Sequence, residues 1–278
     1  MHLRSESAEA EFMYQYESHA PESLGVTAAR LADGVVLHMR HDPISYWSKA
    51  LGFTQEVTPV LIAEILDFYR SCDATTAVLQ FAPYLLPVSF AELAADLGLT
   101  EAGSLVKLGC AVDDVKAGAT NLRIGRVAES DAAEWGELIL RGMGAPGTPL
   151  SEMIANSVAN PAFQAFAAWD GDTMVAGGNL LVHGDVGSIN TGATLPEYRG
   201  RGAQSALIAA RAEAARDAGC RWVVAETGLS APGETNSSFN NLSRAGLRPL
   251  YQRRNWQWTR AAQTAQASGD GHAANPSG

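Results

Sequence analysis

The sequence contains little cysteine, no long apolar run and no excess of positive charge. Its three cysteines, Cys72, Cys110 and Cys220, are widely separated and lack the spacing of a metal site, which predicts buried free thiols in a reducing compartment. No apolar run is long enough to span a membrane, and the polar first ten residues are unlike a secretory signal. The net charge of −10 disfavours nucleic acid and anionic membranes as partners. We therefore expect a cytoplasmic protein that binds neither.

The length of the chain allows two modest domains. It has 278 residues, of which 46% are hydrophobic, and this is enough apolar material for two small cores. Residues 1–10 are polar and terminal, and residues 261–278 consist mainly of alanine, glycine, serine and glutamine. Such segments bury too little apolar surface to offset the entropy of ordering, so both are expected to be disordered.

One segment carries a clear chemical pattern. An apolar run ends at Pro196, a basic glycine-rich turn follows, and an alanine-rich helix begins directly after it. Such a turn directs unpaired backbone N–H groups toward one point, at the positive end of the helix dipole. Gly200 and Gly202 let the backbone approach a ligand closely, and Arg199 and Arg201 add positive charge. We expect this turn to bind a phosphate or pyrophosphate.

The turn stands within a regular order of expected elements. The helix after it has helical periodicity over 203–219, with Arg211 expected on its solvent face, and a buried strand is expected at 222–227. The other elements expected in this half are strands at 122–127, 187–195 and 250–259, a hairpin over 163–183, and helices at 131–142 and 239–245.

The motif Arg199-x-x-Gly202-x-Gln204, in this order of elements, resembles the acetyl-CoA-binding signature of the GNAT N-acetyltransferase superfamily. The signature reads Arg/Gln-x-x-Gly-x-Gly/Ala, so Gln204 departs from it at the last position. The resemblance covers about residues 121–260. It implies an α/β fold with a central, mostly antiparallel mixed sheet flanked by helices. It also implies acetyl-CoA as cosubstrate and transfer of its acyl group to a primary amine.

The resemblance further implies which residues hold the cosubstrate. Backbone groups of Gly192, Ala193 and Thr194 would pair with the pantetheine arm. Asn236 and Asn241 would lie near the same arm. The pyrophosphate would lie on the turn formed by Arg199, Gly200, Arg201, Gly202, Ala203, Gln204 and Ser205, with the Gln204 side chain expected to donate a hydrogen bond to a phosphate.

The N-terminal half carries a faint repeat of the C-terminal half. In each half a helix and a strand lead through a proline-containing loop to a short helix that ends at Gly-Leu, followed by a β-rich stretch. Thr58 and Pro59 predict the start of the first of these helices, but the loop before it contains no arginine. We therefore interpret residues 11–117 as a degenerate GNAT-like domain without a cosubstrate, and residues 118–260 as the acetyl-CoA-binding domain. Each of the two domains is expected to have its own central, mostly antiparallel sheet flanked by helices.

The catalytic groups are less clear from the sequence. Many GNAT enzymes carry a tyrosine as general acid where this chain has Leu242, which cannot donate a proton. Ser238 or Ser243 could supply a hydrogen bond instead. Glu226, at the end of the strand next to the pantetheine strand, is the expected general base, and the alternative is a carboxylate that only binds the following loop. No metal site is expected.

Three functions remain open from the sequence. The first is an N-acetyltransferase that acts on a primary amine of a small molecule or peptide. The second is a non-catalytic acyl-CoA-binding or regulatory protein that kept the turn and lost the acid. A nucleotide-binding protein is disfavoured because the turn lacks a P-loop lysine. The sequence leaves a homodimer open.

Overall fold

The computed structural model describes residues 1–229 and 235–260. The tail at 261–278, expected to be disordered, lies outside these residues. The helices are α1 (His2–Ser18), α2 (Pro59–Ser71), α3 (Phe90–Asp96), α4 (Ala132–Met143), α5 (Leu150–Asn156), α6 (Ala203–Asp217) and α7 (Ser237–Arg244). The strands are β1 (Val26–Leu31), β2 (Gly34–Met39), β3 (Lys49–Leu51), β4 (Thr76–Gln80), β5 (Thr100–Ala111), β6 (Arg123–Arg126), β7 (Phe163–Asp170), β8 (Thr173–His183), β9 (Val186–Thr194), β10 (Trp222–Gly228) and β11 (Arg248–Thr259).

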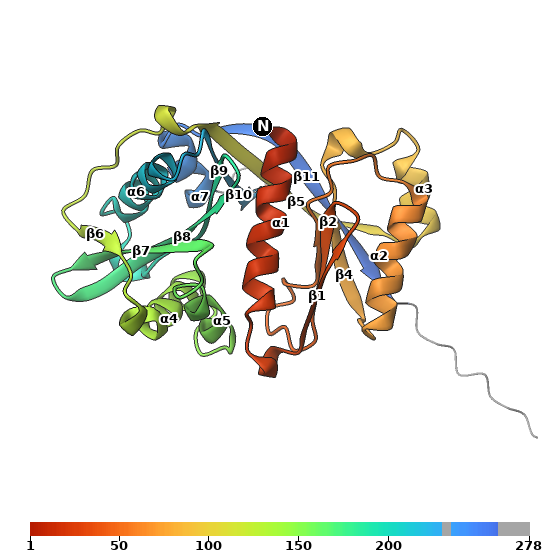
Figure 1. Ribbon diagram of the computed structural model, residues 1–278, viewed down its shortest axis with the longest axis horizontal. Helices are drawn as coiled ribbons and strands as arrows, with labels where there is room; N and C mark the ends of the chain where they lie inside the picture. The colour runs from red at the N-terminus through yellow and green to blue at the C-terminus, as the bar shows by residue number, and fades with distance from the viewer. Residues whose placement is uncertain (230–234, 261–278) are drawn as a thin grey trace, which may run out of the picture.

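All strands of the described residues form one mixed sheet in the order β1-β2-β3-β4-β11-β5-β10-β9-β8-β7-β6. The pairs β3–β4 and β9–β10 are parallel and the others are antiparallel. Helices flank the sheet in both halves (Figure 1). The expected mixed, mostly antiparallel α/β fold is therefore confirmed.

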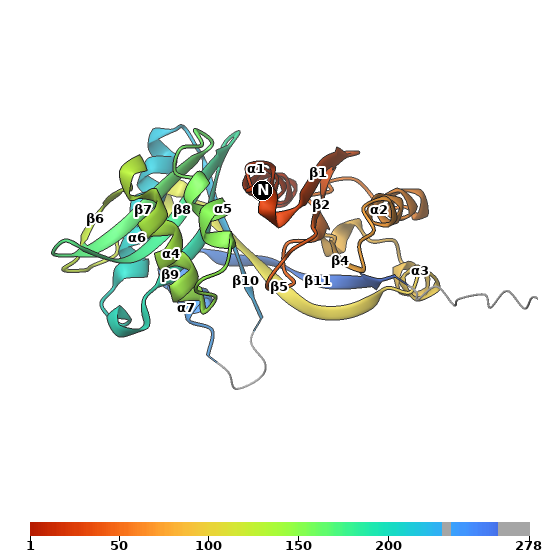
Figure 2. The ribbon, with the colours of Figure 1, turned by 90° about the horizontal axis from the view of Figure 1, so that it is seen from below.

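The last strand of each half lies beside strands of the other half. β5, from the N-terminal half, pairs with β10 over Leu105–Ala111, whereas β11, from the C-terminal half, pairs with β4 over Asn255–Thr259. β5 and β11 also pair with each other, and Figure 2 shows both strands crossing from one half to the other. The boundary expected at residues 117/118 thus divides the chain but does not divide the sheet.

The order of elements in the faint repeat is present in the structure. The run α2-β4-α3-β5 in the N-terminal half corresponds to α6-β10-α7-β11 in the C-terminal half. Thr58 begins α2 as expected, since its side chain accepts a hydrogen bond from the Leu61 amide at 3.2 Å. None of the helices in the described residues is long and apolar enough to cross a membrane. Of the three free thiols, Cys110 and Cys220 are buried and Cys72 is only half-buried.

The expectation of disorder at residues 1–10 is wrong, because they form most of α1. This helix stands between the two halves, with β1 and β2 on one side and β8 and β9 on the other (Figure 1). Met13 and Tyr16 enter the apolar core, and Glu6 and Glu9 are buried among charged side chains of the sheet. An acidic residue is usually exposed, so the sequence pattern places both glutamates in solvent. They are buried because they pair with cationic side chains on strands that are distant in the sequence.

Candidate functional site

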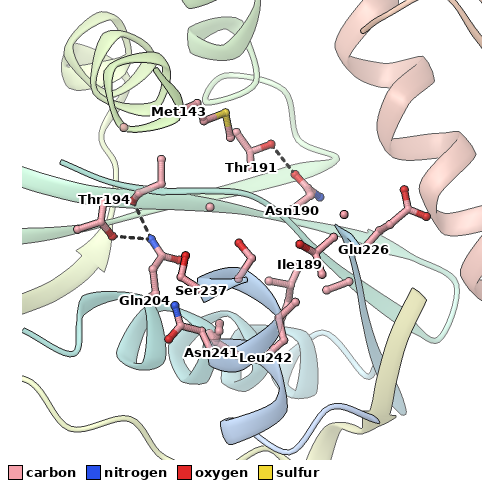
Figure 3. Close-up of a pocket in the computed structure, with 18 of the residues that line it drawn as sticks. Met143, Ile189, Asn190, Thr191, Thr194, Gln204, Glu226, Ser237, Asn241 and Leu242 are labelled. Carbon is pink, nitrogen blue, oxygen red and sulfur yellow. Dashed lines mark hydrogen bonds between the residues drawn. The ribbon is translucent and has the colours of Figure 1, made fainter. Parts of the chain in front are cut away.

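β9 and β10 separate halfway along their length. They pair in parallel only from Trp222 opposite Val186 to Val224 opposite Ser188. Beyond this point the residues of both strands line a cavity of about 1020 Å³, which is large enough for an extended cofactor arm together with a small ligand. Figure 3 shows Ile189 and Asn190 on one strand and Glu226 on the other around this opening.

β9 contains a bulge where it lines the cavity. The register with β8 shifts between the pairs Gly177–Ala193 and Asn179–Asn190, so that Thr191 and Gly192 stand opposite a single residue. Thr191 has a φ of +52°, which is unusual for a β-branched residue. Its hydroxyl donates to Asn190 Oδ1 at 3.0 Å. The ladder with β8 is interrupted at Thr191 and Gly192, and residues 191–194 line the cavity.

Side chains of α6 hold the carbonyl groups on both sides of this bulge. Gln204 Nε2 donates to Ala193 O at 2.7 Å and to Thr194 Oγ1 at 3.1 Å (Figure 3). It also lies 3.3 Å from Gly177 O, to which it donates as well. The expectation that Gln204 would donate to a phosphate is therefore wrong in this structure. The amide instead satisfies acceptors that the bulge leaves without a strand partner.

Arg211, expected on the solvent face of α6, is fully buried. Its Nη1 donates to Asn190 O at 3.0 Å and to Asn179 O at 3.2 Å, and its burial lowers its pKa to about 9. The guanidinium occupies the space beside Gly178, where a Cβ would lie 2.5 Å from Nη1. Helical periodicity could not reveal this, because the need for a donor arises from the bulge on another element.

The glycine-rich turn has the conformation expected of an anion site. Gly200 and Gly202 have φ values of +81° and +79°, and Gly202 is the N-cap of α6. The cavity is lined here by Arg199, Gly200, Gly202, Ala203, Gln204 and Ser205, and on β9 by Gly192, Ala193 and Thr194. Ten of the twelve residues expected to hold the cosubstrate, counting Asn241 of α7, therefore line one cavity.

Arg201 is placed differently from the expectation. Its guanidinium donates to both oxygens of Asp170, at 2.6 and 3.0 Å, at the end of β7. It does not line the cavity, whereas Arg199 does, with Nη2 3.3 Å from Gly142 O. The pairing was not predictable from the turn, since Asp170 lies on a distant hairpin.

α7 contributes one of its two expected asparagines. Asn236 is the N-cap, accepting from the Phe239 amide at 2.9 Å and donating to Gly228 O at 2.6 Å, and it does not line the cavity. Asn241 and Leu242 do line it (Figure 3). Of the two serines considered as substitutes for the missing acid, Ser238 lines the cavity and Ser243 does not.

Glu226 lies on the cavity wall among buried charges. It accepts from Arg253 Nη2 at 2.6 Å and lies 3.0 Å from Lys107 Nζ. Burial raises the pKa of Glu226 to about 7, against the opposing effect of Arg253 and Lys107, and the nearby Glu9 carboxylate raises it further. A carboxyl group with this pKa can accept or release a proton near neutral pH.

Glu9 of α1 is a functional candidate that sequence reasoning missed. It accepts from Arg253 Nη2 at 2.7 Å and from Lys107, and it also lines the cavity. Burial acts to raise the pKa of Glu9, but Arg253 and Lys107 lower it well below its ordinary value. Sequence reasoning missed Glu9 because residues 1–10 were expected to be disordered, so the acidic residues of this segment were not considered for the site.

The remaining wall of the cavity is apolar and comes from both halves. Its side chains are Phe12, Ile44, Tyr46, Trp47 and Leu105 from the first half, and Leu140, Met143, Leu150 and Ile154 from the second. The indole N–H of Trp47 is buried without a partner among the described residues. The cavity thus combines an anion-binding turn, a bulged strand, two buried carboxylates and an apolar wall.

Comparisons with known proteins agree with this geometry. Residues 127–233 match the sequence model of the acetyltransferase (GNAT) family. A GCN5-related N-acetyltransferase from Kribbella flavida is 15% identical, with 93% of this chain and 96% of that chain covered and a TM-score of 0.60. A tandem GNAT protein from the clavulanic acid biosynthesis pathway is 13% identical, with 91% and 94% covered and a TM-score of 0.57.

A conserved protein of unknown function from Staphylococcus epidermidis ATCC 12228 is also similar, at 12% identity, with 88% and 99% covered and a TM-score of 0.58. No curated protein sequence matches the chain. At these identities the structural likeness establishes the fold, and the sequence match establishes the domain. The chain therefore contains a GNAT-family domain at residues 127–233, within a fold that it shares with GNAT acetyltransferases and a tandem GNAT protein.

Proposed function

We propose that this protein transfers the acyl group of acetyl-CoA to a primary amine. The observation that carries the proposal is the meeting of three features in one cavity: the glycine-rich turn before α6, the bulged end of β9, and the buried carboxylate of Glu226. The turn suits a pyrophosphate, the bulge suits a thioester arm, and the carboxylate suits an amine that must lose a proton.

The residues present fit acetyl-CoA. The first turn of α6 leaves N–H groups without intrahelical partners beside Gly200 and Gly202, and a Cβ at Gly200 would meet open space. Arg199 adds one positive charge. Gly192, Ala193 and Thr194 would hold the pantetheine arm along the separated strand, and when bound the cosubstrate supplies an acyl group activated as a thioester.

Proton transfer would be carried out by this chain's own side chains. Glu226 would accept the proton of the amine, because its raised pKa leaves it partly ionised at neutral pH. At the other end, Leu242 replaces the usual phenol, and the hydroxyl of Ser238 lies on the cavity wall. A thiol has a pKa of about 8.5, so a leaving thiolate needs only a hydrogen bond rather than a strong acid.

The absence of the phenol also supports a second candidate. Leu242 cannot donate a proton, and Gln204 already engages the Ala193 carbonyl that would pair with the pantetheine arm. A non-catalytic acyl-CoA-binding or regulatory protein would tolerate both features. We consider this function second, because such a protein would have no need for a carboxyl group of raised pKa on the cavity wall.

A thiol-release assay with a panel of primary amines tests the proposal. We expect acetyl-CoA-dependent thiol release with at least one amine, and one acetyl-CoA bound per chain by isothermal titration, because the corresponding loop before α2 contains no arginine. Binding without release across the whole panel would favour the non-catalytic protein. The absence of binding would refute both candidates.

The two arginines of the turn should differ in their effect on acetyl-CoA binding. Arg199→Ala is expected to weaken binding about tenfold, on the order of 1.4 kcal/mol, through the loss of a charge-assisted contact. Arg201→Ala is its matched control and should change the affinity less than about twofold, because Arg201 is paired with Asp170 away from the cavity. Titration calorimetry at constant salt measures both. A larger loss in Arg201→Ala would show that the Asp170 pair opens when the ligand binds.

A further inference from the structure

Five charged side chains from four elements meet behind the cavity: Glu6 and Glu9 on α1, Lys107 on β5, Glu226 on β10 and Arg253 on β11. We call this set the ion cluster. Arg253 donates through Nη1 to Glu6 at 2.7 Å, and through Nη2 to Glu9 and Glu226 at 2.7 and 2.6 Å. Lys107 contacts Glu9 and Glu226. Three carboxylates face two cations, so the ion cluster has one unneutralised negative charge when all its members are ionised.

The unneutralised charge lies on the cavity side. Glu6 is enclosed, with its side chain 0% exposed, and it accepts from Arg253 and from the Tyr251 hydroxyl. Glu9 and Glu226 keep 11% and 13% of their side-chain surfaces exposed, and both line the cavity. An isolated buried charge is costly, so this pair should take up either a proton or a cation from the cavity.

The titration of the pair agrees with this geometry. Burial raises the pKa of Glu226 to about 7, while Arg253 and Lys107 outweigh burial at Glu9 and lower its pKa. Burial also raises the pKa of Tyr84 and of Tyr251, the phenols nearest to Glu6, so both stay neutral near pH 7. The pair therefore holds a fraction of a proton near neutral pH, and that proton can be displaced.

The surface beside the pair is aromatic. Phe12 lies one turn along α1 from Glu9, and Tyr46 and Trp47 complete this part of the wall. The Lys49 ammonium already lies over the Tyr46 ring, 3.1 Å from its centroid, so this wall offers a ligand apolar contact area and excludes water from the charges beside it. An anionic pair next to such a wall suits a cation that carries an apolar or aromatic body.

We propose that Glu9 and Glu226 together receive the acceptor as an ammonium cation, with its apolar or aromatic body on Phe12, Tyr46 and Trp47. This inference rests on the proposed acyl transfer. It assigns a substrate class to the cavity and makes α1 part of the site. The ammonium takes the place of the proton held by the pair.

The proton balance follows from this arrangement. An N–H bond of the ammonium breaks and its proton passes to a Glu226 oxygen, which leaves the amine lone pair free. The lone pair forms the N–C bond to the acyl carbon as the C–S bond breaks, and the second proton of the nitrogen goes to the thiolate. The products are an amide and a thiol, and the proton on Glu226 is released to solvent.

Binding of 2-phenylethylamine and of 2-phenylethanol, its uncharged analogue, tests the charge requirement. With the full chain saturated with CoA, we expect the amine to bind at least tenfold more tightly than the alcohol. Calorimetry at pH 7 in buffers of different ionisation enthalpy should show release of protons when the amine binds, because burial raises the pKa of Glu226 and the ammonium displaces the proton that the pair holds. Equal binding of the two compounds, or no binding of any primary amine of similar size, would overturn the proposal.

Glu9→Gln tests the role of α1, and Glu11→Gln on the same helix is its matched control, since Glu11 pairs with Arg30 outside the cavity. We expect Glu9→Gln to weaken amine binding at least tenfold and to abolish proton release near pH 7, because loss of the neighbouring carboxylate lowers the pKa of Glu226. Glu11→Gln should change neither quantity.

Two further measurements keep the outcomes separate. Acetyl-CoA affinity should stay within about twofold of the unmodified chain in both variants. If the unmodified chain does not bind acetyl-CoA at all, that result refutes the proposed function rather than this inference. If Glu9→Gln does not fold, Glu9→Asp keeps the charge and should keep proton release. If a folded Glu9→Gln variant binds the amine and releases protons just as the unmodified chain does, that result overturns the inference, because the ion cluster would then only stabilise the fold.

Discussion

Replacing Arg253 with methionine is expected to lower the free energy of unfolding by about 3–5 kcal/mol, the loss typical of breaking a buried ion pair. Arg253 is fully buried and donates to Glu6, Glu9 and Glu226 at 2.6–2.7 Å. Without it, three buried carboxylates share Lys107 as their cation. Methionine fills much of the volume, so the loss reports charge rather than a cavity.

The neighbouring residue provides the control for this variant. Arg254 is on the same strand, its side chain is 61% exposed, and it pairs with Glu101 at 2.6 Å. Arg254→Met should therefore change the unfolding free energy by less than about 0.5 kcal/mol. Urea unfolding monitored by fluorescence measures both variants. Equal, small losses would show that the ion cluster does not stabilise the fold.

The cost of Arg253→Met should also increase with pH. Arg253 is the strongest influence that lowers the pKa of Glu226, so its removal raises that pKa further above the unfolded value. The folded variant then binds protons that the unfolded chain has released, and its stability falls as pH rises from about 4.3 through the raised pKa. Unfolding at pH 5.5 and pH 8 should show the larger loss at pH 8.

Gly202→Ala is expected to reduce acetyl-CoA affinity about 100-fold, on the order of 2.7 kcal/mol. The glycine has a φ of +79°, and a Cβ there would lie 2.2 Å from Ala119 O. The alanine variant must therefore move either residues 118–120 or the turn that begins α6. Either movement redirects the N–H groups that would hold the pyrophosphate.

Gly200→Ala is the control for Gly202→Ala, because it introduces the backbone strain without the steric clash. Gly200 has a φ of +81°, but a Cβ there would meet nothing within 4 Å. Both variants pay about 1–2 kcal/mol for the left-handed conformation, and only Gly202→Ala adds the clash. Titration calorimetry should give a loss for Gly200→Ala at least fivefold smaller. Equal losses would mean that strain alone governs the turn.

Local patterns predicted the parts of the site that depend on one segment. The positions of Gly200 and Gly202 could be predicted from the local backbone conformation of the turn. The positions of Leu242 and Glu226 could be predicted from where they stand in the order of elements. These residues lie on the cavity where the order of elements put them. The mostly antiparallel sheet was implied by the family resemblance that this order of elements supports.

Features that depend on distant partners were not predictable in this way. Arg201 turns to Asp170, Arg211 is buried because a bulge on β9 leaves carbonyl groups unpaired, and Glu9 is buried because Lys107 and Arg253 stand opposite it. Arg201 was expected to hold the pyrophosphate, Arg211 was expected to face solvent, and Glu9 was expected in a disordered end. Each of the partners lies more than 20 residues away in the sequence. Long-range ion pairing cannot be obtained from a periodicity that covers one helix.

The exchange of β5 and β11 has a consequence for synthesis on the ribosome. β4 is the neighbour of β11, so one edge of it has no partner until residues 255–259 have left the exit tunnel. Pairing of distant segments is slow, and an open strand edge invites association with other chains. The N-terminal half must therefore wait until β11 has been synthesised, and two fragments made by dividing the gene after codon 117 would regain the sheet only by assembling with each other.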